Sequence, residues 1–596
     1  MIHIYTYIFA IGTIFAMIDA FNNGANDVAN AWATSVSSRS ISYRQAMVLG
    51  TIFEMLGAIT VGARTAETIK NGIIPNSAFQ NNAGVQMLAF TCALVGTSVW
   101  VLWCTRKSAH VSSTYSLISA VAGVGIATVG FGGVQWGWNN GKGLAAIFAG
   151  LGMAPFISGC FASIIFLLIK FVVLKRENPV PWAVYTSPFF FLIAGTICTL
   201  SIVYKGSPNL GLNKKPAWYI AAVTLGTGGG LFILSAIFFV PYLHTKVIKR
   251  DATIRWYHAF LGPALFWRKT PDVADKAKVP NYAVVQHEEE DDEKSDVDSV
   301  KDMETSGKDV EMGAITPSPS NDVKLTKSYD DLVQDGKDRL NAKLRKMSGP
   351  LGWAMRTLHE NQMGPGEIYE TKNLKIFFKR IPAYIVAGAL YGLHYDIHAA
   401  QTSVAGTPEG RRMERVYEHA TKYPNEVEHT YSFVQIITAC TASFAHGAND
   451  IGNSVGPWAV IYAAWSTGDA AAAKASVPIW QLAVLSGCIS IGLVTYGYNI
   501  MKVMGNKLTY HSPSRGCSME LGAAITILIF SQFSLPVSTS MAITGATVGV
   551  GLCNATFKAV NWQRVGLLFM AWVFTIPIAA AIGGLTMAVI LNAPHF

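Results

Sequence analysis

The chain contains the heptapeptide GANDVAN at residues 24–30 and repeats it as GANDIGN at residues 447–453. At average residue usage, the shared core GAND is expected on the order of one hundredth of a time in a chain of this length, so its second occurrence marks an internal repeat. Another motif is also doubled, as HVSSTY at residues 110–115 and PVSTSM at residues 536–541. Each copy of this second motif opens a glycine-rich apolar stretch. The two motifs keep nearly the same separation in both copies, which predicts a chain built from two related halves.

Apolar segments surround both copies of the repeat. Of the 596 residues, 51% are apolar and 14% are charged, whereas a large soluble enzyme would have about 25% charged residues. A helix that crosses a hydrocarbon core of about 30 Å needs roughly 20 mostly apolar residues. Segments of this kind are predicted at residues 4–21, 46–62, 87–104, 111–129, 144–174, 189–204, 218–243, 433–444, 480–498, 521–533, 537–553 and 565–591. We therefore expect an all-α polytopic membrane protein with about 12 transmembrane helices, several of them broken.

A hydrophilic stretch separates the two halves. It contains the acidic run 288–293 and the sequence TPSPS at residues 316–320, a composition typical of disorder. Its Lys and Arg residues predict a cytoplasmic location. We expect a first transmembrane half at residues 1–247, a partly disordered cytoplasmic loop at 248–379 and a second transmembrane half at 380–596.

Other features of the composition narrow the function classes. The net charge of +9 comes mostly from Lys and Arg in loops, where membrane proteins place them, so it gives no reason to expect nucleic-acid binding. The eight cysteines show no metal-site spacing, and no nucleophile is paired with a base, so we expect neither an enzyme nor an organic cofactor. Residues 376–390 suit either an amphipathic helix in the membrane interface or a helix packed on the bundle.

The GAND motif offers hard oxygen ligands of the kind that small cations bind. Each copy supplies one carboxylate and two amides, from Asp27, Asn26 and Asn30 in the first copy and from Asp450, Asn449 and Asn453 in the second. If the glycine unwinds the helix, free backbone carbonyls join this set. Alternatively, the asparagines only tie helices together by hydrogen bonds. Because a charged carboxylate is costly in lipid, a functional role is favoured most for the two aspartates.

The serine and threonine clusters suit an anion. Small hydroxyls stand at the start of a short helix in both copies, namely Ser112, Ser113 and Thr114 in the first and Ser538, Thr539 and Ser540 in the second. With unpaired backbone N–H groups and the positive end of the helix dipole, they can form an anion-binding site. An ordinary helix N-cap is the alternative. Two copies, each before a short glycine-rich segment, favour a pair of re-entrant hairpins that face one another.

Further polar residues within apolar segments are candidates. Glu54 lies inside one apolar stretch and Glu520 begins another, although Glu520 would also fit the membrane interface. A buried carboxylate needs a cation, a proton or a hydrogen-bond donor as its partner. Asp19 is a lesser candidate, because Ala442 stands at the equivalent position of the second half. For His446, a hydrogen bond between helices is favoured over a proton relay.

The doubled GAND motif, the doubled Val-Ser clusters and the central hydrophilic loop resemble the inorganic phosphate transporter family, and most closely its fungal sodium-phosphate symporters. The resemblance covers essentially all of the chain outside the loop. It implies about twelve transmembrane helices in inverted repeats, two re-entrant hairpins, extracellular termini, a plasma-membrane location and uptake of phosphate driven by sodium. The family usually reads PVSTTH in both hairpins. This chain departs from that pattern but keeps the first serine and the backbone N–H donors.

The resemblance also implies roles for individual residues. Glu54 and Glu520 match the family's essential glutamates, and Ser112 and Ser538 match its hairpin serines. The expected phosphate-binding residues are Ser112, Ser113, Thr114, Ser538, Thr539, Ser540, Asp27 and Asp450. The expected sodium-binding residues are Asn26, Asp27, Asn30, Glu54, Asn449, Asp450, Asn453 and Glu520.

Coupling of an anion to cations has a physical logic here. An anion that enters a low-dielectric site beside several carboxylates is repelled unless cations bind with it. We therefore expect a symporter that works by alternating access. Its expected partners are phosphate, sodium ions and the lipid bilayer, and the sequence does not decide whether it forms a homodimer. Proton coupling is the first alternative. A channel or a phosphate sensor is a further one, although channels usually show a ring of repeated pore motifs.

Overall fold

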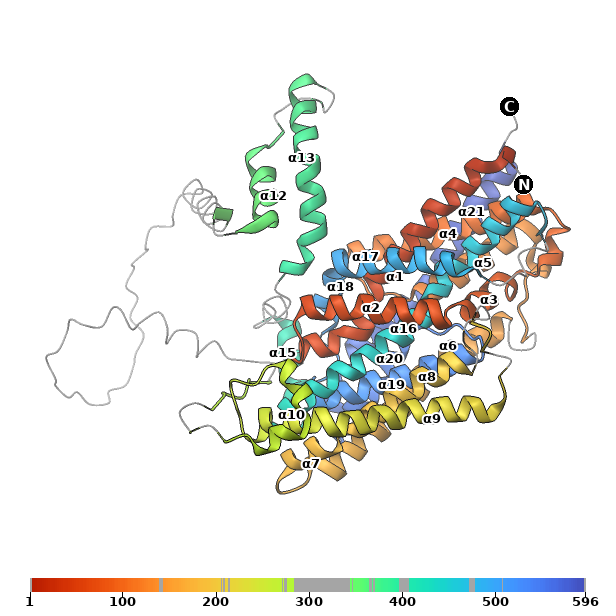
Figure 1. The fold of residues 1–596 in the computed structure, drawn as a ribbon. Coiled ribbons are helices and arrows are strands. Elements are labelled where there is room, and N and C mark those ends of the chain that lie inside the picture. The colour runs from red at the N-terminus through yellow and green to blue at the C-terminus, as the bar shows by residue number, and fades with distance from the viewer. Residues whose placement is uncertain are drawn as a thin grey trace, which may run out of the picture. The chain divides into compact units, whose positions relative to one another are not determined.

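The computed structural model describes residues 3–138, 143–204, 206, 210–212, 215–270, 272, 276–282, 344–345, 347–363, 367, 370–395, 407–470, 477–505 and 507–593. These ranges are mostly helical and contain no β-strand, only one isolated bridge between Asp251 and Lys276. The chain divides into two compact units (Figure 1), one of Met1–Val284 with Gly392–Phe596 and the other of Val285–Tyr391. The disorder predicted within residues 283–343 falls outside the described residues.

The second unit contains helices α12 (Gly349–Glu360) and α13 (Thr371–Leu390), which pack against each other. Helix α13 covers residues 376–390 and exposes Phe378, Tyr384 and Ile385. For this segment, an amphipathic helix in the membrane interface and a helix packed on the bundle both stay predictions. The division of the chain into two transmembrane halves and a loop also stays a prediction.

The first unit is a helical bundle. Its N-terminal part contains α1 (Thr6–Ser37), α2 (Tyr43–Val61), α3 (Ala63–Asn71), α4 (Ala83–Arg106), α5 (Ser113–Val129), α6 (Leu144–Ile169), α7 (Pro179–Thr186), α8 (Pro188–Val203), α9 (Ala217–Leu234) and α10 (Val240–Leu243). Its C-terminal part contains α15 (Pro408–Glu418), α16 (Asn425–Thr467), α17 (Ile479–Tyr496), α18 (Tyr498–Met504), α19 (Pro513–Gln532), α20 (Thr539–Leu552) and α21 (Trp562–Asn592). Short 3₁₀ or π segments join or extend them, namely η1 (His3–Tyr5), η2 (Asn76–Phe79), η3 (Phe131–Gly133), η5 (Lys170–Leu174), η8 (Ser235–Phe239), η9 (His244–Ile248), η10 (Trp256–Trp267), η14 (Gly392–His394) and η16 (Phe557–Ala559).

Within the described ranges, seven helices are long and apolar enough to cross a membrane. Two more, α5 and α20, are apolar but only 17 and 14 residues long. Large apolar side chains on α6, α9 and α21 are exposed, among them Phe156, Trp218, Leu225, Leu585 and Val589. Lipid tails cover such a surface favourably, whereas water does not. The predicted all-α membrane architecture is confirmed.

Helices α1 and α16 carry the two GAND motifs and lie antiparallel against each other. Trp465, near the end of α16, donates a hydrogen bond to Thr6 at the start of α1 (3.2 Å). At the opposite end, Ser38, just after α1, donates to Gln435 in the early part of α16 (2.7 Å). The two related helices therefore run in opposite directions, which confirms inverted repeats.

Glycines let the central helices approach each other closely. A Cβ atom at Gly24 would lie 1.9 Å from the carbonyl oxygen of Ile489 on α17, and one at Gly447 would lie 2.0 Å from that of Glu54 on α2. Both helices continue through the motif, α1 for 32 residues and α16 for 43. The glycine therefore does not unwind the helix, and the condition for free backbone carbonyls as ligands is not met. Its missing side chain serves backbone contact between helices instead.

Helices α4 and α5 form a hairpin whose two open ends meet. Gln86, near the start of α4, donates a hydrogen bond to Asn76 (3.0 Å). The backbone N–H of Gln135, just after α5, donates to the carbonyl oxygen of Ile73 (3.0 Å). Ile73, like Asn76, lies in the segment that leads into α4. The chain therefore runs along α4, turns after Arg106 and returns along α5 to the side from which it came.

Helices α19 and α20 form a second hairpin, which opens at the other end of the bundle. The N–H of Asn561, after α20, bonds the carbonyl oxygen of Leu508, before α19 (2.8 Å). Arg515, at the start of α19, donates to the carbonyl oxygen of Thr421, just before α16 (2.7 Å). The first hairpin begins beside the ring of Tyr5, just before α1. Because α1 and α16 are antiparallel, the two hairpins open at opposite ends of the bundle, and their turns face one another as predicted.

Candidate functional site

Asp27 lies in the middle of α1, fully buried, between the two hairpins. Its Oδ2 accepts a hydrogen bond from the Ser113 hydroxyl of the first hairpin (2.6 Å), and its Oδ1 accepts one from the Ser540 hydroxyl of the second (3.1 Å). Asn30, one turn later, donates to the same Oδ1 (3.1 Å). The Nε2 of His110 lies 4.0 Å from it. One carboxylate thus joins both hairpins.

Asp450 takes the equivalent place on α16. Its Oδ1 accepts a hydrogen bond from Asn449 (2.8 Å), and its Oδ2 accepts one from the Thr539 hydroxyl of the second hairpin (3.1 Å). The Nε2 of His446 lies 2.9 Å from Oδ2. Hydrogen bonds to a charged group contribute about 1.5–3 kcal/mol each, so these contacts hold both carboxylates firmly in place.

The first asparagine of each motif fixes the turn of its own hairpin. Asn26 accepts a hydrogen bond from the backbone N–H of Val111 (3.2 Å). Asn449 accepts one from the N–H of Val537 (3.3 Å) and donates to its carbonyl oxygen (2.7 Å). These two amides bind backbone at equivalent points, so the turns are positioned by the helices that carry the aspartates.

The second asparagine of each motif reaches across to the hairpin of the other half. Asn30 on α1 donates to Thr539 (3.1 Å) and Ser540 (3.2 Å). Asn453 on α16 donates to Thr114 (3.1 Å). The alternative that the asparagines tie helices together therefore describes real contacts. Those contacts converge on the candidate site, so the structural role and a binding role are compatible.

Ser112 and Ser538 are helix N-caps. The Ser112 hydroxyl accepts the N–H of Tyr115 (3.2 Å), and the Ser538 hydroxyl accepts the N–H of Met541 (3.3 Å). The first N–H groups of a helix lack intrahelical partners and carry the positive end of the dipole. The hydroxyl of Thr114 contacts the carbonyl oxygen of Val537 (3.3 Å), so the two helix starts face each other at close range. This geometry suits a small anion.

Glu54 is joined to the site through a histidine. The His446 ring lies between two carboxylates, with Nδ1 2.6 Å from Glu54 Oε1 and Nε2 2.9 Å from Asp450 Oδ2. The ring therefore links α2 to α16, which is the structural role that the sequence favoured. The other oxygen of Glu54, Oε2, is buried without a hydrogen-bond partner.

Glu520 belongs to a separate cluster between α1, α16 and α19. Its carboxylate accepts hydrogen bonds from Thr34 (2.5 Å), Ser35 (2.5 Å), Gln435 (3.0 Å) and Thr438 (2.6 Å). It is fully buried within the protein. The sequence did not point to its four partners, because they come from two helices that meet Glu520 only in the folded chain.

In the site, Glu54 and Asp450 both contact the His446 ring, and hydroxyl and amide groups surround Asp27. Within the described residues, no group of three or more His, Cys, Asp or Glu side chains is arranged to bind a metal ion.

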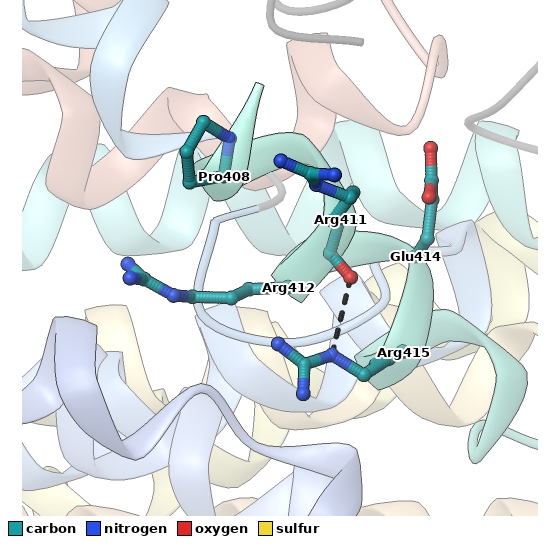
Figure 2. A pocket seen from close by; sticks show the side chains of 5 residues that line it. All are labelled: Pro408, Arg411, Arg412, Glu414 and Arg415. Atoms are coloured by element: carbon teal, nitrogen blue, oxygen red, sulfur yellow. Dashed lines mark hydrogen bonds between the residues drawn. The ribbon is translucent and has the colours of Figure 1, made fainter. Parts of the chain in front are cut away.

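A surface pocket of about 480 Å³ lies on α15, away from the site just described (Figure 2). It is lined by Pro408, Arg411, Arg412, Glu414 and Arg415. The Nε of Arg415 donates to the carbonyl oxygen of Arg411 (3.4 Å), an ordinary contact between successive turns. These exposed side chains make a basic surface and contribute nothing to the buried site.

The sequence was compared with known proteins. Residues 23–583 match the model of the phosphate transporter family. The chain is 38% identical over 614 residues to the phosphate-repressible phosphate permease pho-4 of Neurospora crassa, covering 100% of this chain and 99% of the permease. It is 26% identical over 657 residues to sodium-dependent phosphate transporter 1 of Mus musculus, covering 97% of this chain and 94% of that protein.

A solved structure of a sodium-dependent phosphate transporter is similar in fold. The TM-score is 0.56 at 22% sequence identity, over 99% of this chain and 100% of that chain. At this identity the likeness supports the fold alone. It does not assign a ligand to any individual residue.

Proposed function

This chain belongs to the phosphate transporter family, and from this premise we propose that it is a sodium-coupled symporter that imports inorganic phosphate by alternating access. The observation that carries the proposal is the meeting of two helix N-termini beside Asp27 and Asp450 in an inverted repeat. Phosphate is the anion that the relatives' names specify, and the helix starts supply donors for it.

The carboxylates explain why cations accompany the anion. Phosphate that approached Asp27 and Asp450 alone would meet two negative charges in a medium of low dielectric constant. Sodium ions bound by these aspartates, by Glu54 and Glu520 and by the amides of Asn26, Asn30, Asn449 and Asn453 neutralise that charge. Phosphate then binds at Ser112, Ser113, Thr114, Ser538, Thr539 and Ser540 beside the aspartates.

Inverted symmetry supports alternating access. Each hairpin opens at a different end of the bundle, and the asparagines that cross between the halves join both hairpins to both long helices. Rocking one half against the other would expose the same central site first to one side and then to the other. We place the protein in the plasma membrane with the central loop in the cytoplasm, and we leave the homodimer as a prediction.

The test is phosphate uptake by the purified full-length chain in sealed proteoliposomes. Saturable uptake driven by an inward sodium gradient, with no uptake when choline replaces sodium, is the expected result. A proton gradient that drives uptake equally well without sodium would replace sodium coupling by proton coupling. Flux that does not saturate with phosphate would favour a channel.

Ser112→Ala and Ser538→Ala should each raise the phosphate concentration for half-maximal uptake roughly tenfold or more, because a hydrogen bond to a charged group contributes about 1.5–3 kcal/mol. Sodium dependence should persist. If the two serines only cap their helices, each substitution would instead cost about 1 kcal/mol of stability and leave half-saturation unchanged. Uptake measured against phosphate concentration, normalised to folded protein, separates the two results.

A further inference from the structure

A second buried carboxylate lies on α1 outside the site between the hairpins. Asp19 precedes Asp27 by eight residues, about 12 Å along the helix axis, and its side chain is 1% exposed. Its Oδ2 accepts a hydrogen bond from the Ser454 hydroxyl on α16 (2.7 Å), and Asn23 donates to the same hydroxyl (3.0 Å). None of the ion pairs among the described residues involves Asp19.

Unpartnered oxygens gather around this carboxylate. Among the described residues, Asp19 Oδ1 and Asn23 Oδ1 are buried without a close hydrogen-bond partner, and the Thr97 hydroxyl of α4 has no partner other than the Asp19 carboxylate. Asn23 is tied to Asp19 through Ser454, and Thr97 faces Asp19 from α4. Asn22, beside Asn23, turns its amide nitrogen to the carbonyl oxygen of Ser98 (3.0 Å) and leaves its own oxygen unpartnered. The amide oxygens of Asn22 and Asn23 are therefore acceptors without a donor, which is unfavourable inside a protein.

The second half of the chain has different side chains at the two equivalent positions. At the position equivalent to Asp19 it has Ala442, and at the position equivalent to Asn23 it has His446, whose ring stands between Glu54 and Asp450. The first half has an extra carboxylate and no imidazole at these two positions. Asp19 has hydrogen-bond donors but no cationic side chain beside it among the described residues, so a cation from outside the chain can balance its charge.

We propose that Asp19, Asn23 and Thr97 form a further cation site, separate from the site between the hairpins, and that it binds sodium. The inference rests on the proposed sodium-coupled transport. One carboxylate with amide and hydroxyl oxygens matches a hard monovalent cation. The site lies between the end of the bundle where α1 begins and Asp27, so sodium bound there stands on the route along α1 toward the central site.

The test counts sodium ions bound by the purified full-length protein without phosphate, by equilibrium binding of radioactive sodium. Asp19→Ala, which copies the residue of the second half, should bind one sodium ion fewer than the unaltered chain. Thr97→Val should keep the number and raise the sodium concentration for half-saturation roughly two- to tenfold. Thr91→Val is the matched control on α4, because the Thr91 hydroxyl bonds only the Met87 carbonyl of its own helix (2.9 Å) and should leave binding unchanged.

The possible outcomes decide between the two proposals. Equal numbers of bound sodium ions for Asp19→Ala and the unaltered chain would overturn the cation site. If Asp19→Ala does not fold, the same sodium concentration for half-saturation in Thr97→Val and Thr91→Val would overturn it. A proton at Asp19 would give that same equality. By contrast, failure of the unaltered chain to take up phosphate in a sodium gradient would count against the proposed function and leave the binding count as a valid test of the site.

Discussion

Asp27→Asn and Asp450→Asn should each lower sodium-driven phosphate uptake by at least about a hundredfold, because each removes the charge that binds a cation and keeps the shape of the side chain. The fold should survive. The hydroxyl partners of these carboxylates, such as Ser113 and Thr539, can rotate to accept a hydrogen bond from the new amide. Loss of activity with normal folding would therefore identify the charge itself as the requirement.

The measurement is initial uptake into proteoliposomes, normalised to folded protein recovered as a single species. Glu426→Gln is the matched control on α16, because Glu426 pairs with Arg250 at the surface (3.0 Å) and both side chains are 39% exposed. It should transport at the rate of the unaltered chain, since exposed pairs contribute little. Near-normal sodium-driven uptake by either aspartate variant would refute the assignment of that residue.

Gly492→Ala should strongly reduce the yield and thermal stability of the folded protein. A Cβ atom at Gly492 would lie 1.9 Å from the carbonyl oxygen of Phe21, which is backbone and cannot swing aside as a side chain would. Helices α1 and α17 would have to separate, at a cost of about 1–3 kcal/mol or more for overpacking. The displacement would also shift the part of α1 that leads into Asp27, so residual protein should transport poorly.

Gly487→Ala on the same helix is the control. No atom lies within 4 Å of a Cβ added there, and alanine is favoured over glycine in a helix by about 0.5–1 kcal/mol. Its melting temperature in detergent should equal or exceed that of the unaltered chain. Equal melting temperatures for the two variants would show that the contact between α1 and α17 tolerates a methyl group, against the packing described above.

Local chemistry alone determined much of this protein. Runs of apolar residues must form helices in lipid because the backbone has no other way to satisfy its hydrogen bonds there, so hydropathy predicted an all-helical membrane bundle. The doubled motifs predicted two related halves. The serines at residues 112 and 538 predicted two helix starts, which the structure confirms as N-caps. The helix and N-cap inferences depend on neighbours within a few positions along the chain, and the repeat needs only a comparison of two short motifs.

The tertiary structure decided which polar groups meet. Asn30 binds Thr539 on the opposite hairpin, and His446 binds Glu54 on α2, contacts between residues separated by hundreds of positions. The glycine of the GAND motif shows the same limit. The sequence left open whether this glycine unwinds its helix, and the approach of another helix makes it a contact point in a continuous one. Packing between distant segments sets these contacts, and the periodicity of a single segment carries no information about which partner will lie against it.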